Sequence, residues 1–481
     1  MSVTHFQMYI DGTFTDGESR DTVAVENPAT EEIFATVPAG TIADADRAIA
    51  AARRAQPEWS RRPAIERGRM VRRLASAILD SREHLARIVV AEQGKPISQA
   101  RGEIDATAMF LEYAGEQARR IQGEILPSDH REEDVWIRRV PYGVVAALTA
   151  WNYPSALAGR KLGPALTAGN SVVLKGHEIT PLSGLEIARI AHDLGFPPGV
   201  INVITGGGRS VGQHLVESRD TDLVTMTGSV RAGREIFAAA APGLKPIRLE
   251  LGGKAPFIVL EDADLDRAVD AAIVSRFTNC GQICTCAERI YVHRSLADAF
   301  ISAFVARAKA LRLADPMSDP DMGPKVSRPE LEKIENIVSR AVAGGAEILT
   351  GGNRPGGDLF GRGHWYLPTV MLAPADSLLV REEIFGPIAP IRVIDGFEEA
   401  LAEANASDYG LSAYVFTRNL RRVMQSARDL AFGEIYVNRG CGELVQGFHC
   451  GWKNSGLGGE DGQHGFEGYL RRKTMYVSWS D

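Results

Sequence analysis

Apolar residues recur every three or four positions in two early stretches, residues 43–55 and 66–94. That spacing is typical of amphipathic helices, so we expect the first quarter of the chain to be helical. The pattern changes near residue 130, where residues 135–140 alternate between apolar and polar side chains. Such alternation predicts a half-buried strand.

Short apolar runs then alternate with stretches of helical spacing. The predicted strands in this region are residues 144–150, 171–175, 201–204, 223–226 and 246–251. Strand–helix–strand repeats of this kind predict a mostly parallel sheet with helices on both faces.

A second series of apolar runs begins after residue 254. Its predicted strands are residues 257–260, 289–293, 389–394, 413–417 and 434–438. We therefore predict an α/β fold with two open, twisted, parallel-sheet domains of the Rossmann-like type, joined near residues 251–254. The alternating tail, residues 469–479, is expected to form a small accessory sheet with the strand at 135–140.

Composition and charge limit the classes of function. A chain of 481 residues is too long for one ordinary core, and 44% hydrophobic with 24% charged residues is typical of a soluble globular protein. The net charge of −7, without a long basic run, argues against nucleic acid as a partner. Asn152 and Pro154 interrupt the most apolar stretch, residues 143–159, so we expect no membrane span.

The N-terminal sequence lacks a basic start followed by an apolar stretch, so we expect no secretory signal. The chain has only five cysteines, an odd number. Both features favour a reducing cytoplasm in which the thiols stay free.

Three of the five cysteines crowd into the stretch NCGQICTCAER, at Cys280, Cys284 and Cys286. Structural zinc sites need a second pair of ligands, whereas Cys441 and Cys450 are isolated and far downstream, so we expect no metal. Free cysteines are often buried as small apolar residues, and we favour that interpretation for Cys280 and Cys286. A nucleophile and a reversible redox pair remain as alternatives for the cluster.

Polar side chains stand at the ends of three predicted strands. Asn152 follows the strand at 144–150, Lys175 ends the strand at 171–175, and Glu250 ends the strand near 246–251. Ligands in open α/β sheets bind beyond the carboxyl ends of the strands. We therefore predict that these three residues border a single cleft.

Five motifs, in order along essentially the whole chain, resemble the aldehyde dehydrogenase superfamily. They are TAWNYP (149–154), TGSVRAG (227–233), LELGGKAP (249–256), GQICTCAER (281–289) and EEIFGP (382–387). The segment QGFHCGWKNSGLGGEDGQHGFEGYL (446–470) is similar to the bacterial lactaldehyde/glycolaldehyde dehydrogenase branch. The resemblance implies oxidation of a small-molecule aldehyde.

The resemblance makes Cys284 the nucleophile, Glu250 the general base and Asn152 part of the oxyanion hole, and it adds Lys161 to the catalytic group. The chemistry suits these residue types. A thiolate adds to the aldehyde, the resulting alkoxide expels hydride and leaves a thioester, and water then hydrolyses the thioester. The alkoxide needs hydrogen-bond donors where its charge develops, and the water needs a base.

The resemblance also implies a nicotinamide cofactor, and we predict NAD. The implied cofactor-binding residues are Trp151, Lys175, Glu178, Gly208, Gly228, Ser229, Gly233, Glu383 and Phe385. A carboxylate at Glu178 would accept a hydrogen bond from the ribose 2′-hydroxyl and repel a 2′-phosphate. The stretch KGHE departs from the usual family pattern at Gly176 and His177, and we interpret His177 as a surface residue.

For the substrate, the branch resemblance implies Arg160, Glu443 and His449. Such a pocket favours a short aldehyde that carries a hydroxyl or an anionic group, because buried hydrogen-bonding groups reject substrates that lack a partner. The loop at 439–446 departs from the branch pattern at Cys441 and Gly442. A semialdehyde or a sulfonated hydroxyaldehyde is therefore an alternative.

Three other functions are possible for a protein of this fold. A CoA-acylating dehydrogenase generally lacks the base that Glu250 provides, and a purely structural protein would be expected to lose Cys284 or Glu250. A thiol-based redox sensor is a third alternative.

The predicted organisation assigns a role to each part of the chain. Residues 1–121 and 141–251 are expected to bind NAD, and residues 252–445 to form the catalytic domain. Residues 122–140 and 468–481 resemble the family's oligomerisation elements. We expect a homodimer or homotetramer.

Overall fold

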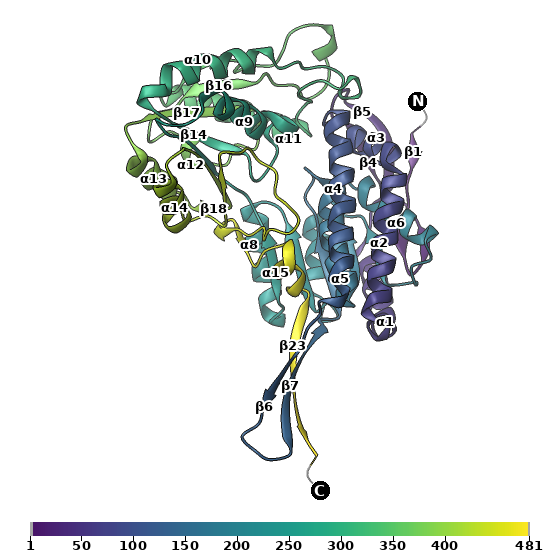
Figure 1. Ribbon diagram of the computed structural model, residues 1–481. Helices are drawn as coiled ribbons and strands as arrows, with labels where there is room; N and C mark the ends of the chain where they lie inside the picture. The colour runs from purple at the N-terminus through teal and green to yellow at the C-terminus, as the bar shows by residue number, and fades with distance from the viewer. Residues whose placement is uncertain (1–2, 480–481) are drawn as a thin grey trace.

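The computed structural model describes residues 3–479, so the first two and last two residues of the predicted segments 1–121 and 468–481 lie outside the described range. Two large sheets, each with its own helices, form the body of the molecule (Figure 1). The chain passes from one to the other between Glu250 and Ala255, where the sequence predicts the junction. The fold is α/β, as predicted.

The first sheet has eight strands, and its five central strands are parallel. In spatial order they are β22 (Gly456–Leu457), β12 (Ile247–Glu250), β11 (Leu223–Thr227), β8 (Val144–Leu148), β9 (Ser171–Lys175), β10 (Ile201–Ile204), β2 (Met8–Ile10) and β3 (Thr13–Thr15). The central five are the five strands predicted from the first series of apolar runs. Antiparallel strands from the two ends of the chain extend the sheet at its edges.

Helices cover both faces of this sheet, because side chains along each central strand point alternately to opposite faces. In β8, Val145 and Ala147 belong to a first buried cluster on one face of the sheet, and Val144 and Ala146 belong to a second buried cluster on the other face. The helices of the first cluster are α2 (Ala64–Asp80), α3 (Arg82–Gln93), α4 (Ile97–Glu116), α5 (Pro154–Ala168) and α6 (Leu182–Asp193). Those of the second are α1 (Ile42–Arg61), α7 (Gln213–Glu217) and α8 (Val230–Ala240).

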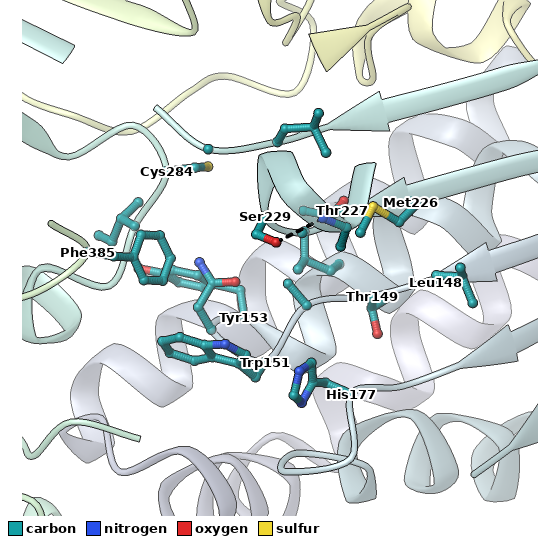
Figure 2. A pocket seen from close by; sticks show the side chains of 18 of the residues that line it. Leu148, Thr149, Trp151, Tyr153, His177, Met226, Thr227, Ser229, Cys284 and Phe385 are labelled. Atoms are coloured by element: carbon teal, nitrogen blue, oxygen red, sulfur yellow. Dashed lines mark hydrogen bonds between the residues drawn. The ribbon is translucent and has the colours of Figure 1, made fainter. Parts of the chain in front are cut away.

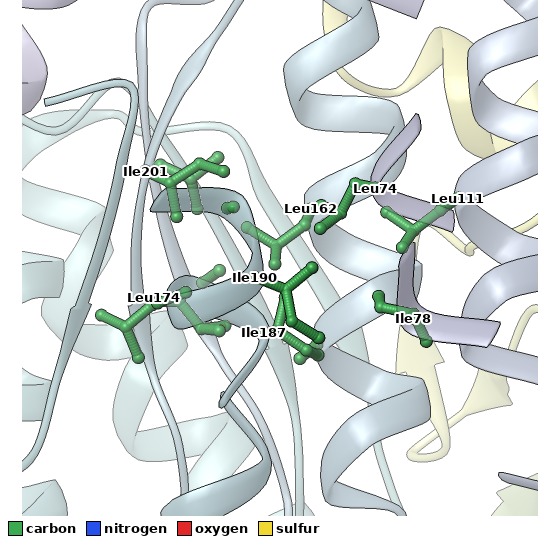
Figure 3. Close-up of a cluster of buried hydrophobic side chains, with 14 of the residues drawn as sticks. Leu74, Ile78, Leu111, Leu162, Leu174, Ile187, Ile190 and Ile201 are labelled. Carbon is green, nitrogen blue, oxygen red and sulfur yellow. The ribbon is translucent and has the colours of Figure 1, made fainter. Parts of the chain in front are cut away.

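Figure 3 shows part of the first cluster, where Leu74 of α2, Leu111 of α4 and Leu162 of α5 meet. All three side chains are fully buried. Burying a leucine of this kind stabilises the fold by about 1.5–3 kcal/mol. The packing fixes the position of α5, which carries the predicted site residues Arg160 and Lys161.

The second sheet has seven strands, of which only the edge strand β15 is antiparallel. In spatial order they are β15 (Glu347–Thr350), β16 (Thr369–Leu372), β17 (Ile388–Ile394), β14 (Ala287–His293), β13 (Ala255–Val259), β19 (Ser412–Phe416) and β20 (Glu434–Val437). Its helices are α9 (Leu265–Phe277), α10 (Arg294–Ala310), α11 (Arg328–Ala343), α12 (Leu378–Arg381), α13 (Phe397–Asn405) and α14 (Leu420–Asp429).

A narrow antiparallel sheet projects from the body (Figure 1). It consists of β6 (Glu124–Pro127), β7 (Glu133–Pro141) and β23 (Leu470–Ser478). Strand β7 pairs with β23 along its whole length, so the structure joins the two alternating segments as the sequence predicts. Trp136 and Tyr476 are exposed on this sheet.

The expectation that the first quarter is helical is wrong for its first part. Residues 4–38 contain five strands, including β1 (Thr4–His5), β4 (Thr22–Asn27) and β5 (Glu32–Pro38), which form a separate small sheet. The hairpin β2–β3 turns at Asp11 and Gly12, where φ is 53° and 79°. Positive φ at both positions is the geometry of the tightest hairpin turns, and it overrides any helical tendency.

Three further short elements are two strands and one helix. Strands β18 (Tyr409–Gly410) and β21 (Trp452–Lys453) pair with each other, and helix α15 (Gly462–Glu467) precedes β23. Within residues 3–479, none of the helices combines the length and the apolar character that a membrane crossing requires.

Candidate active site

A large cavity, of about 1230 Å³, lies between the parts of the chain that carry the two large sheets. In Figure 2, Cys284 and Phe385 lie on one side of it, and Thr149 and Met226, near strand ends of the first sheet, lie on the other. Sites for one small molecule usually measure roughly 300–1,000 Å³. The volume therefore accommodates a cofactor and a substrate together.

The segment before Cys284 is tightly curled. Asn279, Cys280 and Gly281 all have positive φ, at 51°, 56° and 69°. Two non-glycine residues in this region cost free energy, of order 1–3 kcal/mol each, and such strain tends to occur at functional sites. The backbone of Gly253 comes so close that an added Cβ would lie 2.1 Å from the Cys284 carbonyl oxygen. The curl holds Cys284 at the cavity wall.

Asn152 lies at the start of α5, where β8 ends. Its side-chain Nδ2 donates to the backbone carbonyl oxygen of Gln282 at 3.0 Å. The backbone carbonyl oxygen of Asn152 accepts from Lys95 Nζ at 2.9 Å and from Asn279 Nδ2 at 3.1 Å. A side-chain amide has two N–H donors, so one remains for a ligand. Asn152 and Cys284 line the same cavity.

Behind Cys284 lies a buried group formed by His449, Glu250 and Glu434. His449 Nε2 is 3.5 Å from Glu250 Oε2, and His449 Nδ1 is 3.2 Å from Glu434 Oε1. Within residues 3–479, neither oxygen of Glu250 has a hydrogen-bond partner. Burial raises the pKa of Glu250 to about 8.

Arg160 reaches the cavity from α5 with its charge already paired. Its guanidinium lies 2.7 Å from Asp461 Oδ2 and 3.0 Å from Glu443 Oε1, and it packs over the Phe110 ring. Burial opposes the charge, but Asp461 and Glu443 together raise the pKa of Arg160. Despite burial, Arg160 holds the pKa of Glu443 down to about 2. Burial raises the pKa of Asp461 to about 7.

Polar groups line the cavity around β9. Lys175 Nζ is 3.6 Å from Glu178 Oε1, and Glu178 accepts a hydrogen bond from the backbone N–H of Gly208. Burial opposes ionisation of Glu178, yet Lys175 lowers its pKa, so this carboxylate is charged at neutral pH. His177, expected at the surface, lines the cavity.

Helix α8 begins beside the same cavity. Ser229 caps it by accepting a hydrogen bond from the backbone N–H of Ala232 at 3.2 Å (Figure 2). Gly228 and Ser229 line the cavity, whereas Gly233 does not. An added Cβ at Gly233 would lie 2.5 Å from Leu251, so the structure gives that glycine a packing role.

Glu383, Phe385 and Trp151 line a further part of the cavity. Glu383 accepts from the backbone N–H of Gly253 at 2.8 Å, and burial raises its pKa to about 7. The rings of Trp151 and Phe385 meet edge to face, 5.3 Å apart. These groups lie near the loop that carries Cys284.

The sequence model of the aldehyde dehydrogenase family matches residues 14–475. The chain belongs to this family. It is 49% identical over 476 residues to a 3,6-anhydro-alpha-L-galactose dehydrogenase from Vibrio sp. (strain EJY3), which covers 98% of this chain and 99% of that protein. It is 41% identical to the lactaldehyde dehydrogenase of Escherichia coli (strain K12), over 98% of both chains.

A solved structure supports the same assignment. The structure of a 3,6-anhydro-L-galactose dehydrogenase in complex with NAP superposes with a TM-score of 0.97, at 48% identity, covering 99% of this chain and 100% of that one. This protein is therefore an aldehyde dehydrogenase that uses a nicotinamide dinucleotide, and the predicted family and enzyme class are confirmed.

The two cysteines on either side of Cys284 are buried in this dehydrogenase, as the sequence predicts. Cys280 and Cys286 are at most 1% exposed, and burial raises the pKa of each thiol to about 12. A thiol with so high a pKa is a poor nucleophile near neutral pH. Of these three cysteines, Cys284 alone lines the cavity, which it shares with Asn152.

Lys161 is buried behind the cavity wall. Its Nζ lies 2.6 Å from Glu460 Oε1 and 3.1 Å from Thr225 Oγ1. Burial lowers the pKa of Lys161. Burial also opposes the charge of Glu460, but the neighbouring Lys161 lowers the pKa of Glu460 to about 2. Lys161 is not among the residues that line the cavity.

Sequence reasoning missed three acidic partners in the site: Glu434 beside His449, and Glu460 and Asp461 beside α5. The stretch GGED, residues 458–461, gave only a weak signal of these contacts, because charged residues in a glycine-rich turn are ordinarily exposed. Here Glu460 and Asp461 are buried against two cations of α5.

Proposed function

We propose that this enzyme oxidises a neutral 2-hydroxyaldehyde to the carboxylate with NAD. The observation that carries the substrate class is the pairing of Arg160 with Glu443 and Asp461 at the cavity wall. The names of the lactaldehyde and 3,6-anhydro-alpha-L-galactose dehydrogenases support it, because both substrates are hydroxylated aldehydes without an acidic group.

The proposed chemistry uses three side chains of the cavity. Cys284 Sγ, as thiolate, bonds to the aldehyde carbon, and the charge that develops on the aldehyde oxygen faces the free N–H of Asn152. A bound nicotinamide would supply the acceptor for the hydride that leaves the alkoxide carbon, and that carbon then becomes the carbonyl carbon of a thioester on Cys284. Glu250, as carboxylate, then takes a proton from the water that attacks the thioester, and Cys284 leaves as thiolate.

We propose that the cofactor lies along the part of the cavity lined by Lys175, Glu178 and Gly208, with its phosphates near Ser229. The residues present fit such a group. The N-terminus of the eleven-residue helix α8 offers backbone N–H groups and a positive dipole end to a diphosphate. Lys175 and the charged Glu178 offer a donor and an acceptor to ribose hydroxyls. The fixed negative charge of Glu178 favours NAD over NADP.

The charges at Arg160 and Glu443 support selection of a neutral substrate, and His449 lines the same cavity. Because Arg160 already faces two carboxyl groups, it offers little net positive charge to an anionic aldehyde. The Glu443 carboxylate, which lines the cavity, can instead accept a hydrogen bond from a substrate hydroxyl. A buried group of this kind rejects substrates without the hydroxyl by roughly 10⁴-fold in favourable cases.

The test is a panel of aldehydes assayed by NADH absorbance, with NAD and NADP in parallel. It contains lactaldehyde, glycolaldehyde, 3,6-anhydro-L-galactose, succinate semialdehyde, sulfolactaldehyde and propanal. We expect the highest kcat/KM with the hydroxyaldehydes and NAD. A preference for the two anionic aldehydes would refute the neutral-substrate argument and make Arg160 an anion-binding residue.

We also propose the division of labour along the chain. Residues 1–121 and 141–251 bind NAD, residues 252–445 supply the nucleophile, and residues 122–140 and 468–481 join subunits in a homodimer or homotetramer. Within residues 3–479, β6 has no strand partner on its outer edge, and this supports the last assignment, because an exposed edge strand is a template for pairing. Light scattering of the purified enzyme tests the oligomeric state.

The proposed compartment is the cytoplasm, where thiols stay reduced. The five cysteines are all free in the structure, and Cys284 must remain a thiol to act. Fractionation of the source cells with detection of the enzyme tests this proposal.

A further inference from the structure

The start of α5 is capped by a residue of another helix. Tyr153 occupies the N-cap position, and its side chain makes no capping hydrogen bond. Glu103, from α4, supplies the acceptor: its Oε1 accepts from the backbone N–H of Ser155 at 2.8 Å and from that of Ala156 at 3.3 Å. A carboxylate at a helix N-terminus satisfies N–H groups that have no partner within the helix, and the helix dipole favours its charge.

Lys95 joins the same carboxylate to the backbone of Asn152. Its Nζ donates to Glu103 Oε2 at 2.5 Å and to the backbone carbonyl oxygen of Asn152 at 2.9 Å. The ammonium also lies 3.6 Å from the centre of the Tyr153 ring, an attractive cation–π distance. The side chains of Lys95 and Glu103 are fully buried, so water does not compete for these contacts.

We infer that Lys95 and Glu103 are positioning residues, which hold the side-chain amide of Asn152 where it meets the aldehyde oxygen. The inference deepens the proposed function, because it rests on Asn152 as the donor to the developing oxyanion. Within residues 3–479, neither Lys95 nor Glu103 is among the residues that line the cavity. Both therefore act through Asn152 and do not touch the substrate.

Asn152 is anchored at two points, and Lys95 supplies one of them. Asn152 Nδ2 is held by the carbonyl oxygen of Gln282, in the loop that carries Cys284. The backbone carbonyl oxygen of Asn152 is held on the other side by Lys95. Donors aimed at a developing charge must be in place before the reaction, and a misplacement of about 1 Å can slow it about 100-fold.

The variant that tests this role removes both charges together, as Lys95→Met with Glu103→Gln. Removing one charge alone would leave its partner buried and unpaired, whereas replacing a whole buried ion pair by uncharged groups of similar volume is often neutral for stability. A glutamine oxygen can still accept from the N–H of Ser155. The Asn152 carbonyl oxygen loses the hydrogen bond from Lys95 and keeps the one from Asn279.

The matched control is Arg82→Met with Asp105→Asn. It removes an exposed ion pair, 2.6 Å long, between α3 and α4. Asp105 lies two positions after Glu103 on the same helix, so the control removes a charge pair from α4 without reaching Asn152.

The experiment is a double-mutant cycle, in which the pair variant is made in the wild-type and in the Asn152→Ala background. The readouts are the rate of NADH formation in the first turnover, KM, and NAD affinity by titration calorimetry. The aldehyde is whichever of lactaldehyde and 3,6-anhydro-L-galactose gives the higher kcat/KM.

We expect Asn152→Ala alone to slow the first turnover about 10²–10³-fold, the usual loss of one oxyanion donor. The pair variant should slow it about tenfold or more in the wild-type background but less than about twofold in Asn152→Ala, because the amide it positions is then gone. KM and NAD affinity should change less than about threefold, since the lost interaction is made in the transition state. The control should match the wild type.

Two results would overturn the inference alone. One is a pair variant with the wild-type rate, and the other is a pair variant that slows both backgrounds equally. A wild-type rate in Asn152→Ala would refute the proposed oxyanion role as well. If the pair variant does not fold, Glu103→Gln alone replaces it, because this change removes the charge that holds the Lys95 ammonium, and the same outcomes apply.

Discussion

Replacing Glu250 by glutamine tests the proposed hydrolytic step most directly. The substitution keeps the size of the side chain and removes the only feature that lets it accept a proton at neutral pH. Both carboxylate oxygens lack hydrogen-bond partners within residues 3–479, so the amide disrupts no hydrogen bond of the structure. We therefore expect a folded enzyme with a slow deacylation step.

The size of the effect follows from the role and the pKa of Glu250. A positioned general base accelerates proton transfer by roughly 10²–10⁴-fold, which corresponds to about 3–5 kcal/mol. With its pKa raised to about 8, only about one tenth of Glu250 is ionised at pH 7. Because the ionised form is the base, wild-type deacylation should rise about tenfold per pH unit below pH 8 and level off above it.

The assay combines mass spectrometry with rapid-quench kinetics. In Glu250→Gln, an acyl adduct on Cys284 should accumulate within the first turnover, with a burst of NADH followed by a slow steady rate that no longer rises toward pH 8. A wild-type rate, or the absence of any adduct together with a linear time course, would refute the assignment of Glu250 as the base.

Three further substitutions probe the other parts of the site. Cys284→Ala should abolish turnover while NAD binding, measured by titration calorimetry, stays within about twofold; normal turnover would exclude covalent catalysis through this residue. Arg160→Leu leaves the carboxyl groups of Glu443 and Asp461 buried without their cation, so unfolding should become easier by about 3–5 kcal/mol, and an unchanged melting temperature would contradict the pairing. Glu178→Gln should raise kcat/KM with NADP relative to NAD by at least about tenfold, because it removes the charge that repels a 2′-phosphate; an unchanged ratio would separate this carboxylate from cofactor choice.

The strongly periodic parts of the fold were predictable, and the compact turns were missed. Among the five central strands of the first sheet, β8 and β9 carry near-continuous apolar runs, since both of their faces are buried. The hairpin at Asp11 and Gly12 carried a recognisable signal, an Asp-Gly pair between apolar residues, which helical expectation overrode. The break at Ser81 between α2 and α3 had none, because neither glycine nor proline marks it.

In the site, strand ends were predictable and long-range pairs were not. Asn152 and Lys175 reach one cavity because the carboxyl ends of neighbouring parallel strands meet at the same edge of a sheet. The pairing of Arg160 with Asp461 joins residues about three hundred positions apart, and only the packing of the late loop on α5 creates it. No local pattern in a single sequence encodes such a contact.

The loop around Cys441 is predicted to set the size of the substrate. Cys441 and Gly442 line the same cavity as Arg160, and Gly442 has a φ of 123°, where a side chain would be strained. Small residues there leave room for a bulky substrate. A Cys441→Leu substitution should therefore reduce kcat/KM for 3,6-anhydro-L-galactose by about tenfold or more and leave lactaldehyde within about threefold, since lost complementarity of one or two methylene groups costs about 1–3 kcal/mol. Equal losses for both aldehydes would show that this loop supports the nucleophile and does not set the size of the substrate.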